Sequence, residues 1–256
     1  MIMIRDDQIV FFLGIPGSGW AKIDSLLRCC KKFKFNESDI NENTVWQRNT
    51  NRYYLNHKGH FLGPGSGVGE GFMDIGANYT RESFIEECLK VYDDVNDEDN
   101  YMFKCHWFCE RHNINWLIRN FPNSKYIAVL RDVELCNHRW LESMTFNKDY
   151  PNYSAWMVKE DPDEEFGKHC IENEQNLRRL NRLHDNELRS FVRRYADIIF
   201  CPTKYMLDRM DFEWDEKGHH EFTWYKRCYI SDVNLYTRAP KYETSIAFYN
   251  CNEILF

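Results

Sequence analysis

The chain has 256 residues, and its composition is that of a folded globular protein. Hydrophobic residues make up 43% and charged residues 29%, and 18 Phe, 15 Tyr and 8 Trp supply enough apolar bulk for one large core. The formal net charge of −7 argues against duplex DNA as a partner, because neutralising its phosphates requires a basic surface. We therefore expect a single domain over residues 1–256 and no nucleic-acid partner.

The sequence also bears on the compartment. No segment approaches the roughly 20 consecutive apolar residues that are needed to span a bilayer. Residues 1–10 lack the basic segment, the long apolar run and the cleavage site of a signal peptide. The ten cysteines are scattered, so we expect free, mostly buried thiols rather than disulfides. These features predict a soluble cytoplasmic protein without a membrane span.

The first predicted element is a buried strand over residues 8–13, followed by a turn rich in Gly and Pro. Apolar residues at helical spacing then predict an amphipathic helix over residues 20–30. Residues 36–80 are polar and rich in Asn and Gly. Long irregular stretches in compact domains are often functional, and a surface excursion is an equally weighted alternative.

Strands and helices alternate along most of the remaining chain. In order, we expect a helix over 81–92 with Thr80 as N-cap, a strand over 101–107, a helix over 113–121, a strand over 126–130, a helix over 134–145, a helix or helix pair over 168–195, a strand over 197–201 and a helix over 204–210. The tail from residue 214 is expected to be a hairpin or an irregular cap. This alternation predicts an α/β fold, a three-layer sandwich around a mostly parallel sheet.

The most informative segment is residues 11–23, FFLGIPGSGWAKI, which runs from a strand through a glycine-rich turn into a helix. This is the arrangement of a phosphate-binding loop. A triphosphate-binding loop reads G-x-x-x-x-G-K-[ST], whereas Trp20 and Ala21 follow Gly19 here. The segment therefore predicts backbone amides that bind an anion without the side chains specific to ATP or GTP. A turn with no ligand is the alternative.

Two further segments place polar side chains at the ends of predicted strands. Lys104 and His106 alternate with Cys105, so both are expected on the same face of the second strand. Beside a bound anion, a histidine can remove a proton from a hydroxyl and a lysine can stabilise negative charge. Arg131 follows the third strand, where a guanidinium can bind phosphate through two hydrogen bonds; a salt bridge to Asp132 is the alternative.

Two other patterns receive a structural interpretation. Cys105, Cys109 and His112 have spacings that suit zinc, but strand alternation turns Cys105 away from His106, so no metal is expected. The arginine-rich stretch over residues 178–194 is interpreted as a solvated helix face with local carboxylate partners. The alternative for this stretch is contact with an anionic acceptor such as a sulfated glycan.

Taken together, these segments resemble the sulfotransferases that use 3′-phosphoadenosine 5′-phosphosulfate. Pro16-Gly17-Ser18-Gly19-Trp20 is similar to the turn P-x-S-G-[TW], which binds the 5′-phosphosulfate in that family. Lys104-Cys105-His106 is similar to the strand end that supplies the catalytic base. Residues 124–132, SKYIAVLRD, resemble the element that binds the 3′-phosphate, and Lys217-Gly218 is similar to a loop that closes over the nucleotide.

The resemblance implies a P-loop NTPase-like fold and transfer of a sulfuryl group to a hydroxyl or amine of an acceptor, such as a carbohydrate or a small molecule. It implies His106 as base and Lys104 as charge stabiliser, with no metal. The implied donor-binding residues are Pro16, Gly17, Ser18, Gly19, Trp20, Lys22, Arg131, Asn137, His138, Arg139, Lys217 and Gly218.

This chain departs from the family pattern in three places. Gly17 stands where the family has Lys or Arg, with Lys22 nearby, and Arg139 stands where a serine binds the 3′-phosphate, with Asn137 or His138 preferred over Ser143 as substitutes. The third departure is the pair His219-His220 directly after Lys217-Gly218. Residues 36–80 and 140–195 are expected to be acceptor-side insertions, and 214–256 a C-terminal cap. A P-loop kinase-like nucleotide-binding protein and a non-catalytic member of the sulfotransferase fold are the alternative functions.

Overall fold

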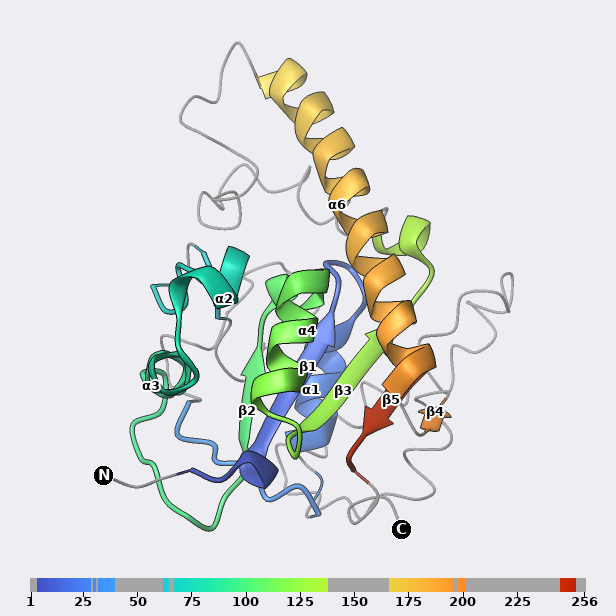
Figure 1. The fold of residues 1–256 in the computed structure, drawn as a ribbon. Helices are drawn as coiled ribbons and strands as arrows, with labels where there is room; N and C mark the ends of the chain where they lie inside the picture. The colour runs from blue at the N-terminus through green and yellow to red at the C-terminus, as the bar shows by residue number, and fades with distance from the viewer. Residues whose placement is uncertain are drawn as a thin grey trace, which may run out of the picture.

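A computed structural model describes residues 4–28, 30, 32–39, 62–64, 67–137, 166–195, 198–200 and 245–251. Its centre is a five-stranded sheet in the order β2-β1-β3-β5-β4. The strands are β1 (Ile9–Gly14), β2 (Tyr101–Lys104), β3 (Lys125–Leu130), β4 (Ile198–Phe200) and β5 (Ser245–Tyr249). Only β5 runs against the others (Figure 1). The predicted α/β class with a mostly parallel sheet is confirmed.

Helices cover both faces of this sheet (Figure 1). They are α1 (Trp20–Arg28), α2 (Ile75–Asn78), α3 (Arg81–Leu89), α4 (Arg111–Asn120) and α6 (Phe166–Tyr195), with 3-10 turns η1 (Asp6–Gln8), η2 (Phe72–Asp74) and η3 (His106–Cys109). Residues 133–137 are also helical. The helix α1 packs on one face, and α4 and α6 pack on the other.

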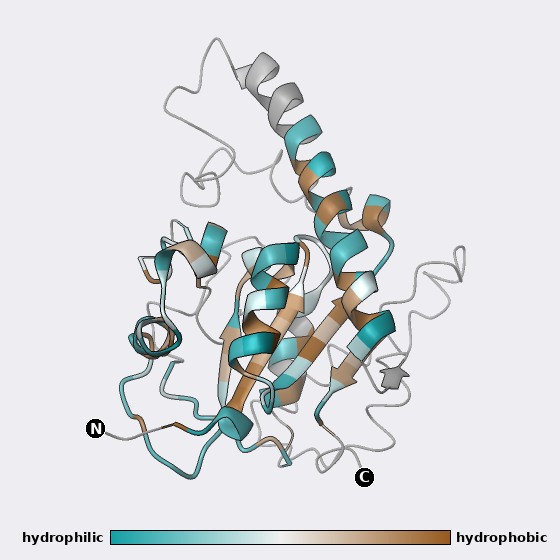
Figure 2. Cartoon of the chain, in the orientation of Figure 1, coloured by the Kyte–Doolittle hydropathy of each residue, from teal (hydrophilic) through white to brown (hydrophobic). Residues whose placement is uncertain are grey.

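The alternation of β1 explains why both faces are covered. Ile9, Phe11 and Leu13 lie in the core on the α4 side, whereas Val10 and Phe12 lie in the core on the α1 side. All of them are fully buried, as expected for a central strand in a parallel arrangement. Figure 2 shows the strands as predominantly hydrophobic and the outward faces of the helices as hydrophilic.

Several local predictions are confirmed with small shifts of boundary. The Thr80 side chain accepts a hydrogen bond from the backbone N–H of Ser83 and so caps α3. Cys88, Cys105, Cys109 and Cys136 are buried free thiols. Residues 168–195 belong to one continuous helix, α6, rather than to a helix pair. None of the described helices combines the length and apolar character that a membrane crossing requires.

Two predictions about strands are wrong: the end of the second strand and the place of residues 245–249. The second strand ends at Lys104 rather than at residue 107, because the chain turns into η3 there. Residues 245–249 were expected in a C-terminal cap, but they form β5 and pair with both β3 and β4 inside the sheet. Pairing of β3 with a segment more than a hundred residues away leaves no local signal in the sequence.

Part of the segment 36–80 is integrated into the core rather than lying on the surface. Phe72 and Ile75 are fully buried against the α4 side of the sheet. The buried Asn113 side chain accepts from the Ile75 N–H and donates to the Phe72 carbonyl, each at 2.9 Å. Residues 40–61 of this segment, the rest of the predicted helix 134–145 beyond residue 137, and the predicted helix 204–210 lie outside the described residues.

Candidate functional site

The loop between β1 and α1 has the conformation that its glycines predict. Gly17 and Gly19 have φ angles of +82° and +83°, which side-chain-bearing residues rarely adopt. The Ser18 N–H donates to the Ile15 carbonyl at 3.1 Å and closes the turn. Trp20 then begins α1, so the N-terminus of this helix follows the loop directly. Helix N-termini attract anions through their free N–H groups and their dipole.

Gly17 is required for a second reason. A Cβ atom at this position would lie 2.0 Å from the carbonyl oxygen of Cys136, which belongs to the helical segment after β3. Glycine suits this contact, because the Cys136 backbone cannot move aside as easily as the end of a flexible side chain could. A lysine or arginine at this position would therefore force the loop or the Cys136 backbone to shift.

His106 lies against the loop. It is the first residue of η3, and its Nδ1 atom is 2.6 Å from the Gly14 carbonyl oxygen. Its ring stacks on Trp20, with ring centroids 3.9 Å apart. Because a carbonyl oxygen can only accept, Nδ1 carries the proton in this contact, and in the neutral ring the lone pair is on Nε2. His106 is thus oriented by two contacts with the β1–α1 unit.

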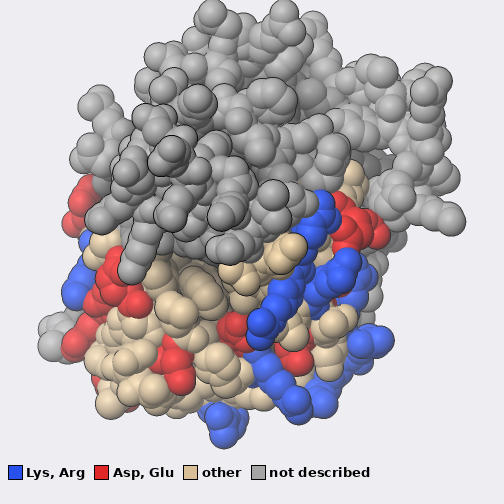
Figure 3. Space-filling model, turned by 90° about the horizontal axis from the view of Figure 1, so that it is seen from above, with Lys and Arg blue, Asp and Glu red and all other residues tan. Residues whose placement is uncertain are grey.

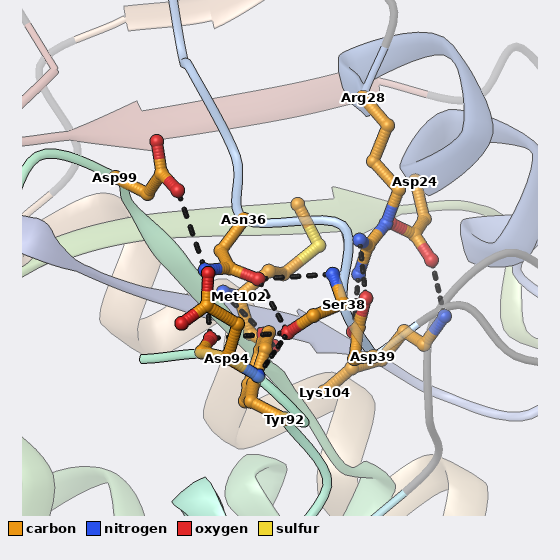
Figure 4. A network of polar contacts seen from close by, with 10 residues as sticks. All are labelled: Asp24, Arg28, Asn36, Ser38, Asp39, Tyr92, Asp94, Asp99, Met102 and Lys104. Atoms are coloured by element: carbon orange, nitrogen blue, oxygen red, sulfur yellow. Dashed lines mark hydrogen bonds and ion pairs between the residues drawn. The ribbon is translucent and has the colours of Figure 1, made fainter. Parts of the chain in front are cut away.

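Lys104 lies on the same side of the sheet as His106, as predicted, but its ammonium group is already bound. It forms a buried ion pair with Asp24, one helical turn after Trp20 in α1 (Figure 4). Asp24 also pairs with Arg28 at 2.8 Å, and Arg28 forms two 2.8 Å hydrogen bonds with Asp39. Lys104 is therefore part of a buried cluster of alternating charges under α1.

The cluster keeps Asp24 ionised. Burial by itself would raise the pKa of Asp24, but Lys104 and Arg28 outweigh it and hold this pKa below its ordinary value. The same attraction to Asp24 and Asp39 raises the pKa of Arg28 despite its burial. A buried charge is tolerated only when it is paired, so these groups depend on one another.

Arg131 reaches the loop from the end of β3. Its side chain is buried, and Nη1 donates to the Gly17 carbonyl at 3.4 Å. Its own carbonyl accepts a hydrogen bond from Arg189 of α6 at 2.9 Å. The neighbouring Asp132 accepts from the Leu135 N–H at the start of the helical segment 133–137. The guanidinium of Arg131 is thus brought to the apex of the loop.

The helix α6 carries a buried polar face that its charge pattern does not predict. Asn181 donates to the Pro16 carbonyl at 3.4 Å and to Asn137 Oδ1 at 2.7 Å, and His184 Nε2 lies 2.7 Å from Glu110 Oε1. Asp185 pairs with Arg189 at 2.8 Å. A sequence signal exists in the interruption of an apolar stripe. Asn181, His184 and Asp185 lie between Leu177 and Leu188, which are also buried.

The arginines near the middle of α6 have carboxylate partners. Glu134 pairs with Arg178 and with Arg182, each at 2.7 Å. The hydrogen bond from Arg182 lowers the pKa of Glu134. On the described surface in Figure 3, Lys and Arg side chains stand beside Asp and Glu. These contacts agree with the interpretation of a solvated, ion-paired face.

The structure places only some of the predicted residues. Pro16, Gly17, Ser18, Gly19, Trp20, His106, Arg131 and Asn137 meet at the carboxyl edge of β1 and β3. Lys22 belongs to α1, but its side chain is outside the described part. His138, Arg139, Lys217 and Gly218 lie outside the described residues.

The described cysteines near the site are packing residues. Burial raises the pKa of Cys105 to about 12 and that of Cys136 to about 12, so neither is a reactive thiolate at neutral pH. Within the described residues, no group of three His, Cys, Asp or Glu side chains could hold a metal ion.

Gly17→Ala should destabilise the protein more than Gly67→Ala. Both glycines have φ near +83°, so each alanine has a conformational cost of about 1–2 kcal/mol. Only the Gly17 substitution meets backbone atoms, whereas nothing lies within 4 Å of a Cβ at Gly67. Overpacking adds about 1–3 kcal/mol. Urea unfolding measures the difference, and equal losses in the two variants would contradict the contact with Cys136.

Asp24→Asn should lower the free energy of unfolding at pH 7 by about 3–5 kcal/mol, because it removes the charged carboxylate that pairs with the buried Lys104 ammonium. The folded-state pKa of Asp24 is below its ordinary value of 3.8, so its stabilising contribution is present above that value. As the pH falls through the folded-state pKa, this contribution disappears and the two proteins should converge.

Urea unfolding of both proteins from pH 7 into acid tests this expectation. Asp7→Asn is the matched control, because Asp7 is exposed and pairs only with the exposed Arg5 among the described residues. That variant should keep the stability of the parent at all pH values. A difference between Asp24→Asn and the parent that persists unchanged in acid would show that the cause is not the charge of Asp24.

The chain was also compared with known proteins. No family model matches it. No curated protein and no solved structure matches it either.

Proposed function

We propose that the chain binds 3′-phosphoadenosine 5′-phosphosulfate at the β1–α1 loop and transfers its sulfuryl group to a hydroxyl or amine of an acceptor. This proposal includes a P-loop NTPase-like fold. The observation that carries it is the meeting of three segments that are far apart in the sequence: His106 contacts Gly14, and Arg131 contacts Gly17 of the loop. These are the segments on which the resemblance to sulfotransferases rests.

The charges around the loop suit an anionic donor. The N-terminus of α1 contributes a partial positive charge. Arg131 adds a full positive charge at the loop apex. Because Asp24 binds Lys104, and because a side chain at Gly17 would clash with the Cys136 backbone, Arg131 rather than Lys104 stabilises negative charge in this proposal.

In the proposed reaction, the acceptor oxygen or nitrogen attacks sulfur in line with the bond to the 5′-phosphate. The S–O bond breaks, and its electron pair leaves with adenosine 3′,5′-bisphosphate. His106 removes the acceptor proton through Nε2, since its Nδ1–H donates to the Gly14 carbonyl. Arg131 and the loop amides stabilise the charge that develops on the leaving phosphate.

A non-catalytic nucleotide-binding protein is the second candidate function. The observation that favours it is the buried cluster that binds Lys104, which leaves this ammonium committed to Asp24. In this case the loop would still bind the nucleotide, but no acceptor would be modified. The two candidates therefore differ in turnover and agree in nucleotide binding.

Adenosine 3′,5′-bisphosphate should stabilise the protein, and ATP with magnesium should not. A ligand at about 100 times its Kd adds about 2.7 kcal/mol, which is roughly 5–10 °C in Tm for a chain of this size. Arg131→Ala should weaken nucleotide binding by about 10–100-fold through loss of a charged hydrogen bond, as measured by calorimetry. Arg119→Ala, at the exposed far end of α4, is the control. Stabilisation by ATP with magnesium alone would favour the kinase-like alternative.

His106→Asn should separate catalysis from binding. The asparagine amide can still donate to the Gly14 carbonyl, but it has no Nε2 lone pair to accept a proton. We expect turnover with labelled donor and a panel of hydroxyl and amine acceptors to fall by about 10²–10⁴-fold, while affinity for adenosine 3′,5′-bisphosphate is retained. Unchanged turnover would exclude His106 as the base. Nucleotide binding without turnover by the parent protein would favour the non-catalytic candidate.

A further inference from the structure

A cavity of about 190 Å³ lies between α4 and the C-terminal end of α6. Sites for drug-sized ligands have roughly 300–1,000 Å³, so this one suits a small metabolite rather than a nucleotide. Its walls include Arg111, Ile114 and Asn115 of α4 and Glu187, Phe191 and Arg194 of α6. Two cations and one anion, carried by two different helices, therefore face the same space.

Contacts at both ends of α4 give the direction of α6 beside it. Glu110, directly before α4, lies against His184 of α6. After the other end of α4, the Phe121 carbonyl accepts a hydrogen bond from the Tyr126 hydroxyl, and the Tyr126 ring packs on Phe191 of α6. The two helices thus run side by side in the same direction (Figure 1).

This arrangement puts the three charges in order along the cavity. Arg111 is the first residue of α4, and Glu187 follows His184 by three residues, so both belong to the same end of the cavity. Arg194 comes two helical turns later, about 10 Å further along α6. Its guanidinium lies over the Tyr195 ring, 5.7 Å from the centroid. One end of the cavity therefore carries a cation and an anion, and the other end carries a cation.

The protein does not neutralise these charges itself. Among the residues that the structure describes, Arg111, Glu187 and Arg194 form no ion pair with one another or with other side chains. By contrast, Arg182 and Arg189 of the same helix each pair with a carboxylate. The three charged groups at the cavity are thus available to a ligand, with which charge-assisted hydrogen bonds are the strong ones.

A ligand that matches the three charges has two anionic groups and one cationic group. Its cation and one of its anions must lie together, opposite Glu187 and Arg111, and its second anion must lie further along, opposite Arg194. An acidic α-amino acid has this arrangement, with the α-ammonium beside the α-carboxylate and a second carboxylate at the end of the side chain. The buried side chains of Ile114 and Phe191 provide apolar contacts for its methylene groups.

The cavity is separate from the β1–α1 loop. Phe191 at its wall packs on Tyr126, the second residue of β3, whereas Arg131 contacts the loop from beyond the end of that strand. At about 3.3 Å per residue, the five steps from Tyr126 to Arg131 span about 16 Å. A ligand in the cavity therefore does not occupy the proposed nucleotide site.

We propose that Arg111, Glu187 and Arg194 form a binding site for a free acidic amino acid of the glutamate class. Arg111 binds the α-carboxylate, Glu187 accepts hydrogen bonds from the α-ammonium, and Arg194 binds the side-chain carboxylate. A residue within a peptide lacks the free ammonium, the free α-carboxylate or both, so the site selects the free amino acid. This inference is independent of the proposed transfer reaction.

Calorimetry on the full chain tests the charge match, with glutamate as the probe. Glutarate lacks the ammonium, and glutamine lacks the second carboxylate. We expect saturable binding of glutamate and at least about tenfold weaker binding of the other two, the equivalent of one charged hydrogen bond. Equal affinities for the three compounds, or no saturable binding at millimolar glutamate, would overturn the proposal.

Variants assign the groups. Arg111→Gln and Arg194→Gln should each weaken glutamate binding at least about tenfold. Glu187→Gln should bring the affinities for glutamate and glutarate close together, because the partner of the ammonium loses its charge. Arg193→Gln is the matched control, since Arg193 is exposed, adjoins Arg194 and does not line the cavity. An equal loss in Arg193→Gln would indicate a general effect of net charge and would overturn the site.

Discussion

The site depends on the close contact between Gly17 and the backbone of Cys136. This contact joins the β1–α1 loop to the chain that leaves β3, and it has no room for a Cβ atom. With the loop fixed there, Arg131 reaches the Gly17 carbonyl and Asn137 reaches Asn181. The loop apex is therefore held from the β3 side, and its conformation is set before any ligand arrives. A preformed loop binds an anion without the cost of ordering flexible backbone.

The same contact determines how positive charge is supplied. A side chain at position 17 would clash with the Cys136 backbone, and the cation that contacts the loop comes from another segment, at Arg131. Two cations at strand ends were available, and the structure separates their roles. Lys104 neutralises Asp24 inside the core under α1 and stabilises the packing of that helix. Arg131 extends over the loop backbone instead. Cations with similar positions in the strand pattern thus pair with a buried carboxylate in one case and contact the loop backbone in the other.

The helix α6 connects the elements around the site. Its buried polar face contacts the loop at Pro16, the segment after β3 at Asn137, the turn before α4 at Glu110 and the end of β3 at Arg131. In Figure 1 the helix crosses the carboxyl edge of the sheet, and its N-terminal part extends beyond that edge. The helix thus joins the loop, the segment after β3 and the turn before α4. Arg178 and Arg182 pair with Glu134, whereas Asn181 and His184 on the same helix are completely buried.

The sequence by itself determined the features that depend on neighbouring residues. The alternation in β1, the glycine conformations of the loop, the N-cap of α3 and the approach of His106 and Arg131 to one sheet edge all follow from local patterns and from the direction of parallel strands. Only the tertiary structure decided the place of β5, the pairing of Lys104 with Asp24 and the contacts of α6. Each of these features joins segments that lie far apart in the chain. Which strand pairs at a sheet edge, and which cation pairs with a buried carboxylate, depends on how the other elements have packed. Short-range periodicity carries no information about that choice.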